Sequence, residues 1–177
     1  MSYFVGIDNG KDGAVVVLDP GGAIVAKHKT PILKASTKGG KKAGRDEYNI
    51  PGMRDLLQEY RNDGICFIEK AQPMPMMMGG VVANYQRGLS YGLWQGILVT
   101  LGIPYEVFGP RAWQKVMMAG INVEDTKQAA LIAAQRLWPK EDWRRSQLCK
   151  KADDGFVDAA MICEYGRRVR SGRVQAV

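Results

Sequence analysis

Three short apolar segments of this chain begin or end with carboxylates, and this pattern is the strongest constraint on its fold. Asp8 closes an apolar run at the N-terminus, and Glu69 closes a second one. Asp154 and Asp158 open a third apolar segment near the C-terminus. A carboxylate at the end of a buried strand is costly unless something offsets its charge. A shared divalent cation would do so, and the pattern therefore predicts that the three segments meet at one place.

The order of strand and helix signals predicts a mixed sheet covered by helices. Five strands are expected, at residues 3–8, 13–19, 23–30, 65–69 and 104–108. Helices are expected at residues 50–60, 81–101, 111–118, 126–138 and 154–170. The first three strands are joined by short turns, whereas the later ones alternate with helices, which predicts parallel pairing. We therefore expect one α/β domain whose sheet has three antiparallel and then two parallel strands.

The chain carries an excess of positive charge, with a formal net charge of +7 and a pI of about 9.4. This balance favours a polyanionic partner, nucleic acid first and an anionic membrane surface second. A basic protein without such a partner is the alternative. Because no stretch approaches the roughly 20 apolar residues of a membrane span, we expect no membrane segment.

The cysteine and histidine content excludes several other classes of site. Cys66, Cys149 and Cys163 are odd in number and show no paired spacing, which argues against a disulfide framework. This usage suits a reducing cytosol. His28 is the only histidine, so neither a structural zinc site nor a Ser-His-Asp triad is expected.

The acidic residues have the spacing of a cation site. Residues four apart on a helix share a face, so Asp154 and Asp158 would point to the same place. Together with Asp8 and Glu69 they offer the oxygen ligands that Mg²⁺ and Mn²⁺ prefer. Two such ions about 4 Å apart can activate a water and stabilise a leaving oxygen in phosphodiester cleavage. Combined with the basic charge, the acids favour a metal-dependent nuclease.

Each acid also has a purely structural interpretation. Asp8 could cap a turn through its side chain. Glu69 could pair with Lys70 or Arg87 at the surface. Asp153 or Asp154 could cap the N-terminus of the last helix without any metal. These alternatives stay open for each residue taken singly, but both buried strands end in acids.

The motifs in their chain order resemble those of the RuvC-like Holliday junction resolvases, the crossover junction endodeoxyribonucleases. The matching segments are Gly6-Ile7-Asp8, Ile68-Glu69, residues 152–160 (Ala-Asp-Asp-Gly-Phe-Val-Asp-Ala-Ala) and residues 102–115, the last being similar to the family's fifth strand and the turn after it. An Asp-Asp-Gly followed by a later acid and an alanine resembles the phage-borne branch.

This resemblance implies a ribonuclease H-like fold, a homodimer, dependence on Mg²⁺ and paired nicks in four-way DNA junctions. By position, Asp8, Glu69, Asp154 and Asp158 match the family's metal-binding, catalytic acids. Many RuvC enzymes place the last two such positions three apart, and that slot is Gly155 here. We therefore choose Asp154 as the third acid and keep Asp153 as the alternative, more suited to capping the helix.

Three regions are expected to contact DNA. Lys115 follows the fifth strand and would touch the scissile phosphate, unless it is simply a solvated lysine. Residues 34–45 read as a mobile basic loop that follows the DNA backbone or is a disordered insert; its cations are Lys38, Lys41, Lys42 and Arg45. Met76 and Met77 lie in a Pro- and Gly-rich loop and would wedge against unstacked bases or fill a core gap.

Gly88, Gly92 and Gly96 place a strip of glycine along the expected long helix. We expect this strip either to form the dimer interface or to pack closely on its own sheet.

Two other functions compete with the nuclease. Residues 6–13 resemble the phosphate-gripping hairpin of the actin and sugar-kinase phosphotransferases. That class needs two such domains, for which 177 residues are too few. The other competitor is a branched-DNA-binding protein without catalysis.

Overall fold

A computed structural model describes residues 3–38, 41–42, 44–75 and 80–175 of the chain. Its main sheet contains β1 (Tyr3–Asp8), β2 (Ala14–Leu18), β3 (Ile24–Lys29), β8 (Gly64–Glu69) and β9 (Tyr105–Phe108), in the order β3-β2-β1-β8-β9. The pairs β1–β2 and β2–β3 are antiparallel, whereas β1–β8 and β8–β9 are parallel. The predicted α/β fold of three antiparallel and two parallel strands is therefore confirmed.

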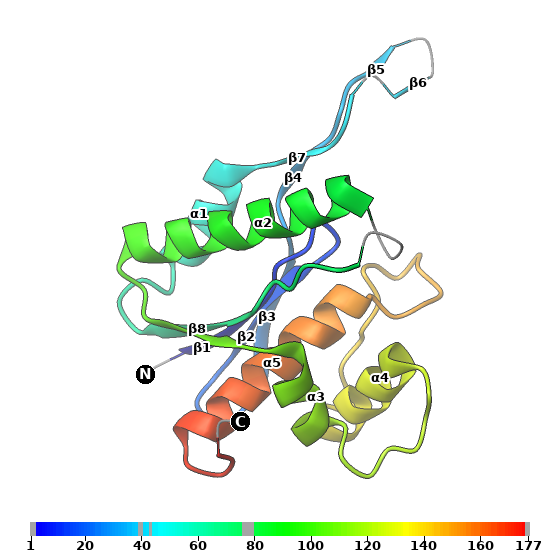
Figure 1. Cartoon of the computed structure of the whole chain (residues 1–177). Helices are drawn as coiled ribbons and strands as arrows, with labels where there is room; N and C mark the ends of the chain where they lie inside the picture. Colours follow the sequence, from blue (N-terminus) through cyan, green and yellow to red (C-terminus); the bar gives the residue numbers. More distant parts are fainter. Residues whose placement is uncertain (1–2, 39–40, 43, 76–79, 176–177) are drawn as a thin grey trace.

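Helices cover both faces of this sheet (Figure 1). The helices on one face are α1 (Ile50–Gln58) and α2 (Gly80–Leu101). The helices on the other face are α3 (Pro110–Met117), α4 (Thr126–Leu137) and α5 (Asp154–Arg170). Among the described residues, none of the helices has the length and apolar character needed to span a membrane.

The alternation of side chains along the central strands decides which face carries the acids. Val5 and Ile7 of β1 pack in the cluster beneath α1 and α2, whereas Phe4 packs against the cluster of α3, α4 and α5. Successive residues of a strand point to opposite faces, so Asp8 shares the face of Phe4. The same alternation puts Glu69 with Phe67 on the α5 side. Both acids therefore face the same group of helices.

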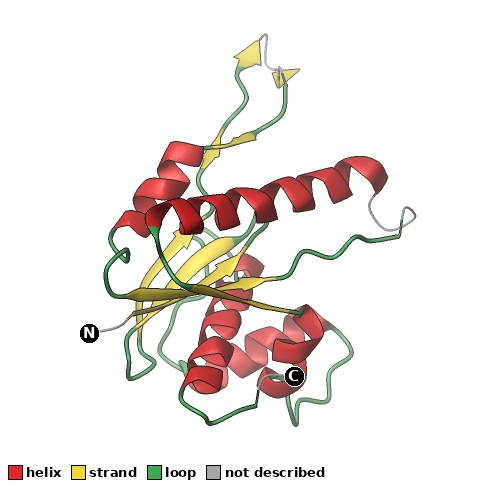
Figure 2. Ribbon diagram, turned by 60° about the vertical axis from the view of Figure 1, so that its left-hand side comes forward, coloured by secondary structure: helices red, strands yellow, loops and turns green. Residues whose placement is uncertain are grey.

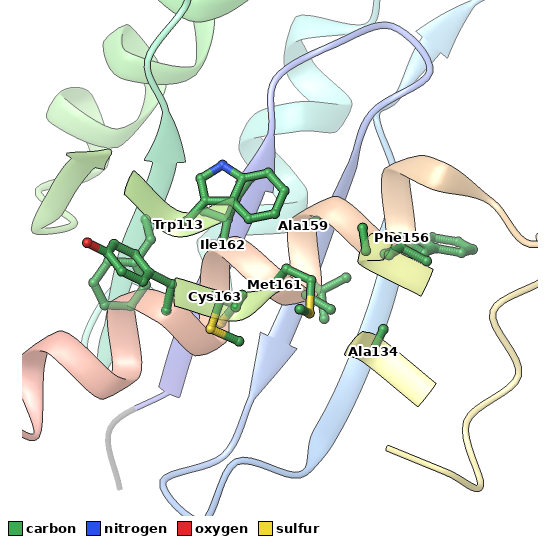
Figure 3. Close-up of a cluster of buried hydrophobic side chains, with 14 of the residues drawn as sticks. Trp113, Ala134, Phe156, Ala159, Met161, Ile162 and Cys163 are labelled. Carbon is green, nitrogen blue, oxygen red and sulfur yellow. The ribbon is translucent and has the colours of Figure 1, made fainter. Parts of the chain in front are cut away.

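Helix α5 lies at the centre of the hydrophobic cluster between the sheet and the helices α3, α4 and α5 (Figure 3). Nearly all of its residues 155–167 are buried. The helix lies directly on β1 at Gly6, where an added Cβ would come within 2.1 Å of the Ala159 carbonyl oxygen. It also touches the β1–β2 turn at Gly155, where a Cβ would lie 2.4 Å from the Asp12 carbonyl oxygen. Because these two glycines carry no Cβ, the helix can approach β1 and the β1–β2 turn this closely.

The basic segment differs from the predicted loop. Two short antiparallel pairs form along it, one between β4 (Ile32–Leu33) and β7 (Glu47–Tyr48) and one between β5 (Thr37–Lys38) and β6 (Lys41–Lys42). We call residues 32–48 the hairpin arm; it extends away from the sheet and the helices (Figures 1 and 2). The prediction missed it because backbone pairing in a two-stranded ribbon needs no apolar period.

The glycine strip of α2 does not pack on the sheet. Gly88, Gly92 and Gly96 are all exposed, and a Cβ added at any of them would meet no atom within 4 Å. The expectation that the strip serves close packing against its own sheet is therefore wrong. The buried residues of this helix are instead Ser90, Trp94, Ile97, Leu98 and Leu101.

All three cysteines are free thiols. Cys66 and Cys163 are buried in the core, as expected from their apolar surroundings in the sequence.

Candidate active site

Two acids lie side by side at the carboxyl ends of adjacent parallel strands. Residues Ile7 and Ile68 are register partners in the β1–β8 pair, so the next residues, Asp8 and Glu69, close the two strands at the same edge. Neighbouring strands are about 4.8 Å apart. Because both side chains face α5, the two carboxylates share one space.

Asp158 joins this pair from α5. It immediately precedes Ala159, whose carbonyl oxygen lies against Gly6 of β1. Burial, together with the negative charges of Asp8, Glu69 and Asp154, raises the pKa of Asp158 to about 8. A carboxyl group whose pKa responds to these charges lies near them in a medium of low polarity. Asp158 of α5 therefore faces the edge of the sheet at which β1 and β8 end.

The pKa values of Asp8 and Glu69 are also raised. Burial is the main cause that raises the pKa of Asp8 to about 7, and the charge of Glu69 adds to it. The Gly10 backbone N–H and the cation of Lys29 oppose this rise. Burial also raises the pKa of Glu69, against a hydrogen bond from Trp113. These carboxyl groups therefore lack enough positive charge around them to ionise at their ordinary pKa values.

Neighbouring side chains hold Glu69 in place. The indole Nε1 of Trp113 donates to Glu69 Oε1 at 2.7 Å. The buried amide of Asn9 donates from Nδ2 to the Glu69 backbone carbonyl at 2.6 Å, and the Asn9 carbonyl accepts a hydrogen bond from Ser90 Oγ of α2. Glu69 is thus fixed at both its side chain and its backbone. The Glu69 side chain therefore bonds to Trp113 instead of forming the surface ion pair with Lys70 or Arg87 that a purely structural role would involve.

Asp153 is the cap of α5. Its carboxylate accepts from the backbone N–H of Phe156 at 3.2 Å and pairs with Lys29 at 2.6 Å and Arg145 at 3.0 Å. Burial raises the pKa of Asp153, but the bonds from Lys29, Phe156 and Arg145 outweigh burial and lower the pKa overall. The expected role of Asp153 as a helix cap is confirmed.

Asp154 lies at the rim of the acidic group. Its side chain is half exposed and pairs with Lys127 of α4, with 2.5 Å between Oδ2 and Nζ. This hydrogen bond to Asp154 raises the pKa of Lys127. Asp154 therefore contributes charge to the group that Asp158 senses, but a lysine holds it at the edge.

The acids fit a hard divalent cation in their chemistry. Asp8, Glu69 and Asp158 are partly buried carboxylates, and a cation would relieve the repulsion that Asp8 and Asp158 experience from the other acids. Within the part of the chain that the structure describes, however, no group of three or more Asp, Glu, His or Cys side chains is arranged so that it could hold a metal ion. That these acids bind a cation therefore stays a prediction.

The residues expected to contact DNA lie on several different elements. Lys115 is exposed on α3, two residues after Trp113, and Arg45 is exposed on the hairpin arm. The backbone of Lys38, Lys41 and Lys42 forms β5 and β6. Met76 and Met77 lie outside the described residues. Where the methionine loop begins, Asn84 of α2 clamps the backbone of Met74 by two hydrogen bonds of 2.8 and 2.9 Å.

Sequence reasoning missed the residues that support the acids. Asn9, Lys29 and Lys127 contact groups 60, 124 and 27 positions away in the chain, so no local period links them to their partners. Asn9 does adjoin Asp8, and its position directly after a strand that ends in an acid was the one available signal.

Comparison with known proteins supports the fold. No protein-family model matches the chain, and no curated protein matches it in sequence. The structure is similar to that of Thermus thermophilus RuvC in complex with a Holliday junction substrate, at 14% sequence identity over 100% of both chains with a TM-score of 0.62. A second Thermus thermophilus RuvC structure is 13% identical over 99% of each chain, with a TM-score of 0.57. The chain therefore has the fold of RuvC over its whole length, as its motifs predicted.

Proposed function

We propose that this protein is a metal-dependent endonuclease that resolves four-way or other branched DNA junctions by hydrolysing phosphodiester bonds. The observation that carries the proposal is the RuvC-like fold of the whole chain, in which Asp8 and Glu69 close adjacent parallel strands and Asp158 of α5 responds to their charges. Such a group of acids at the edge of a RuvC-like sheet is a candidate centre for phosphoryl chemistry.

Asp8, Glu69 and Asp158 would hold two Mg²⁺ ions, for which Mn²⁺ can substitute, and Asp154 would join them on release from Lys127. These ions supply the Lewis acidity that activates a water and stabilises the leaving oxygen. The protein's own contribution is orientation: Trp113 and Asn9 fix Glu69, and the contact of α5 with Gly6 fixes Asp158 beside Asp8. No covalent intermediate with the protein is expected.

The positive charge of the chain supports a DNA substrate. Its formal net charge is +7, and three lysines lie in the short strands of the hairpin arm. We propose that the hairpin arm and Lys115 contact phosphates, and that Met76 and Met77 lie against bases at the junction centre. Phosphate contacts of this kind provide affinity and orientation rather than sequence selection.

A homodimer is the second part of the proposal, because resolution requires paired nicks. The exposed glycine strip of α2 would let the same helix of a second copy approach closely. Beside the strip lies a groove of about 410 Å³ between α1 and α2, whose lining is mainly apolar and includes Ile97 and Leu101. We place such a dimer in the cytosol of a bacterium or of a phage-infected cell.

A cleavage assay tests the proposed function. The purified protein is incubated with a synthetic four-way junction and with a linear duplex of the same sequence, with and without Mg²⁺. We expect symmetric nicks in the junction only, and only with the metal. The Asp8→Asn variant should bind the junction without cutting it. Junction binding by the unmodified protein without any cleavage would favour the non-catalytic alternative, and normal cleavage by Asp8→Asn would reject the assigned centre.

A further inference from the structure

A cleft separates the base of the hairpin arm from the first half of α2. Its volume is about 370 Å³, within the range of sites for small ligands. The residues that carry the argument are Lys11, Tyr48, Tyr85, Gln86, Leu89 and Leu93. None of the acids of the candidate active site lines this cleft.

The cleft has the surface chemistry of a stacking site. Tyr85 is 64% exposed at its wall, although a large aromatic side chain is usually better buried. Leu89 and Leu93 follow it at intervals of four residues, and the three side chains form one apolar stripe of α2. An aromatic ring beside an apolar stripe is the arrangement on which nucleic-acid bases stack.

One polar atom in the cleft has no partner. Oε1 of Gln86 is buried and accepts no hydrogen bond from any residue that the structure describes. A buried acceptor without a donor is costly, so a ligand that brings an N–H group would be favoured there.

The charges that line the cleft balance one another. Lys11 and Arg45 stand against Asp46 and Glu47. Lys11 donates to the Asp46 carbonyl at 2.6 Å and lies over the Tyr48 ring, and Asp46 also accepts from the backbone N–H of Ala35. A lining of balanced charge suits an uncharged flat group better than a phosphate.

The cleft adjoins the candidate active site. Lys11 lies on the β1–β2 turn, three residues after Asp8. Ser90 of α2, on the helix that lines the cleft, donates to the backbone carbonyl of Asn9, the residue after Asp8. The cleft and the acids therefore lie on either side of one turn, close enough for one DNA strand to reach both.

We propose that the cleft between the hairpin arm and α2 receives one unstacked base of the DNA strand whose phosphate lies at Asp8. This inference rests on the proposed function, since it assumes that branched DNA is the substrate. Branch points suit such a site because their bases are unstacked at lower cost than those of a regular duplex. The base stacks on Tyr85, and an N–H group on its exposed edge donates to Gln86 Oε1.

Any unpaired base can satisfy the acceptor of Gln86. Adenine, cytosine and guanine offer an exocyclic amino group, and thymine offers its N3–H, on the Watson–Crick edge that unpairing exposes. The cleft should therefore hold an unstacked base near the exchange point without selecting one of the four.

A double-mutant cycle between protein and DNA tests this inference. The non-cutting Asp8→Asn protein is titrated with four-way junctions that lack a single base at successive positions around the exchange point. At one position, we expect deletion of the base to weaken binding about tenfold, and Tyr85→Ala to weaken binding to the intact junction by the same factor. The two changes together should cost no more than either alone. Tyr85→Phe should bind normally, whereas Gln86→Leu should weaken binding to the intact junction but not to the junction that lacks this base.

Matched controls separate the possible outcomes. Val82→Ala is the control on the same helix, because Val82 is half exposed and does not line the cleft. Additive effects of Tyr85→Ala and base deletion at every position would overturn the proposal. An oligomeric state changed by Tyr85→Ala but not by Val82→Ala would also overturn it, since Tyr85 would then contact protein. The proposed function fails separately, if the unmodified protein does not cut the junction in Mg²⁺.

Discussion

Trp113 donates its indole N–H to Glu69 across 2.7 Å, and this bond joins α3 to an acid at the end of β8. The bond also turns one carboxylate oxygen toward α3 and leaves the other for a ligand. Trp113 is almost completely buried, so the geometry of the bond is held by the surrounding core.

Replacing Trp113 with Phe removes this donor while keeping an aromatic ring in the core. We expect the rate of junction cleavage to fall about tenfold with little change in junction affinity, because Glu69 loses its orientation but the DNA contacts remain. Single-turnover cleavage and binding titrations measure the two effects. Trp138→Phe is the control, since it removes a similar bond, from Nε1 to the Gly22 carbonyl at 2.8 Å, far from the acids. Equal loss of cleavage in both variants would contradict a specific role for Trp113.

The stability of the metal-free protein should fall as the pH rises from 5 to 8.5. The pKa values of Asp8 and Asp158 are raised to about 7 and 8, so the folded state holds protons that the unfolded state has lost in this range. Unfolding therefore becomes easier as these groups ionise. The Asp158→Asn variant should be more stable than the unmodified protein at pH 8, by on the order of 2 kcal/mol. Denaturant unfolding at pH 5 and pH 8 measures this, and a stability independent of pH would argue against the buried group.

Binding of Mg²⁺ should compete with the same protons. The cation requires ionised carboxylates, so its affinity should rise at least tenfold between pH 6 and pH 8. Calorimetry in two buffers of different ionisation enthalpy measures the protons released on binding. Asp158→Asn should release about one proton fewer than the unmodified protein. Equal proton release by both proteins would remove Asp158 from the cation site.

Substitutions of Asp153 and Asp154 at the start of α5 should differ in their effects on stability and on cleavage. Asp153→Ala removes the cap and the Lys29 ion pair, and we expect a loss of about 1–2 kcal/mol of stability. Asp154→Asn should leave stability within about 0.5 kcal/mol but reduce cleavage by at least 100-fold. Thermal unfolding and cleavage assays check both. Asp125→Ala, which removes the cap of α4, provides a control for the loss of a cap alone. A reversed pattern would make Asp153 the third acid.

Shortening the hairpin arm should weaken junction binding without changing the rate of cleavage of bound DNA. Replacement of residues 36–44 by a two-residue turn removes Lys38, Lys41 and Lys42. We expect weaker junction binding and a salt dependence whose slope on a log–log plot falls by up to about 2.7, if all three lysines contact phosphates. Cleavage at saturating protein should stay unchanged. An unaltered salt slope would exclude the arm from the DNA interface.

Much of this architecture follows from local patterns. The strands that end at Asp8 and Glu69 are apolar, compact and flanked by turn residues, and the alternation of strands and helices predicted parallel pairing in the second half of the chain. The structure adds that β1 is the parallel neighbour of β8, which places Asp8 and Glu69 at one edge of the sheet.

The remaining features depend on contacts that no local pattern encodes. The hairpin arm is held by backbone pairing among residues of low apolar content, and its sequence therefore resembled a loop. Asn9 and Trp113 acquire their roles only when α2 and α3 pack onto opposite faces of the sheet. The glycine strip was visible in the sequence, but which way it faced depended on the packing of Trp94 and Leu98 on the far side of α2.

The contact at Gly6 has a consequence for the whole molecule. A single methyl group at that position would push α5 off its strand and carry Asp158 away from Asp8, because the added carbon would overlap both Ala159 and Cys163. The close approach of α5 to Gly6 is thus needed both for the packing of the helix and for the position of Asp158. A substitution that loosens this contact would separate Asp158 from Asp8 well before it unfolds the domain.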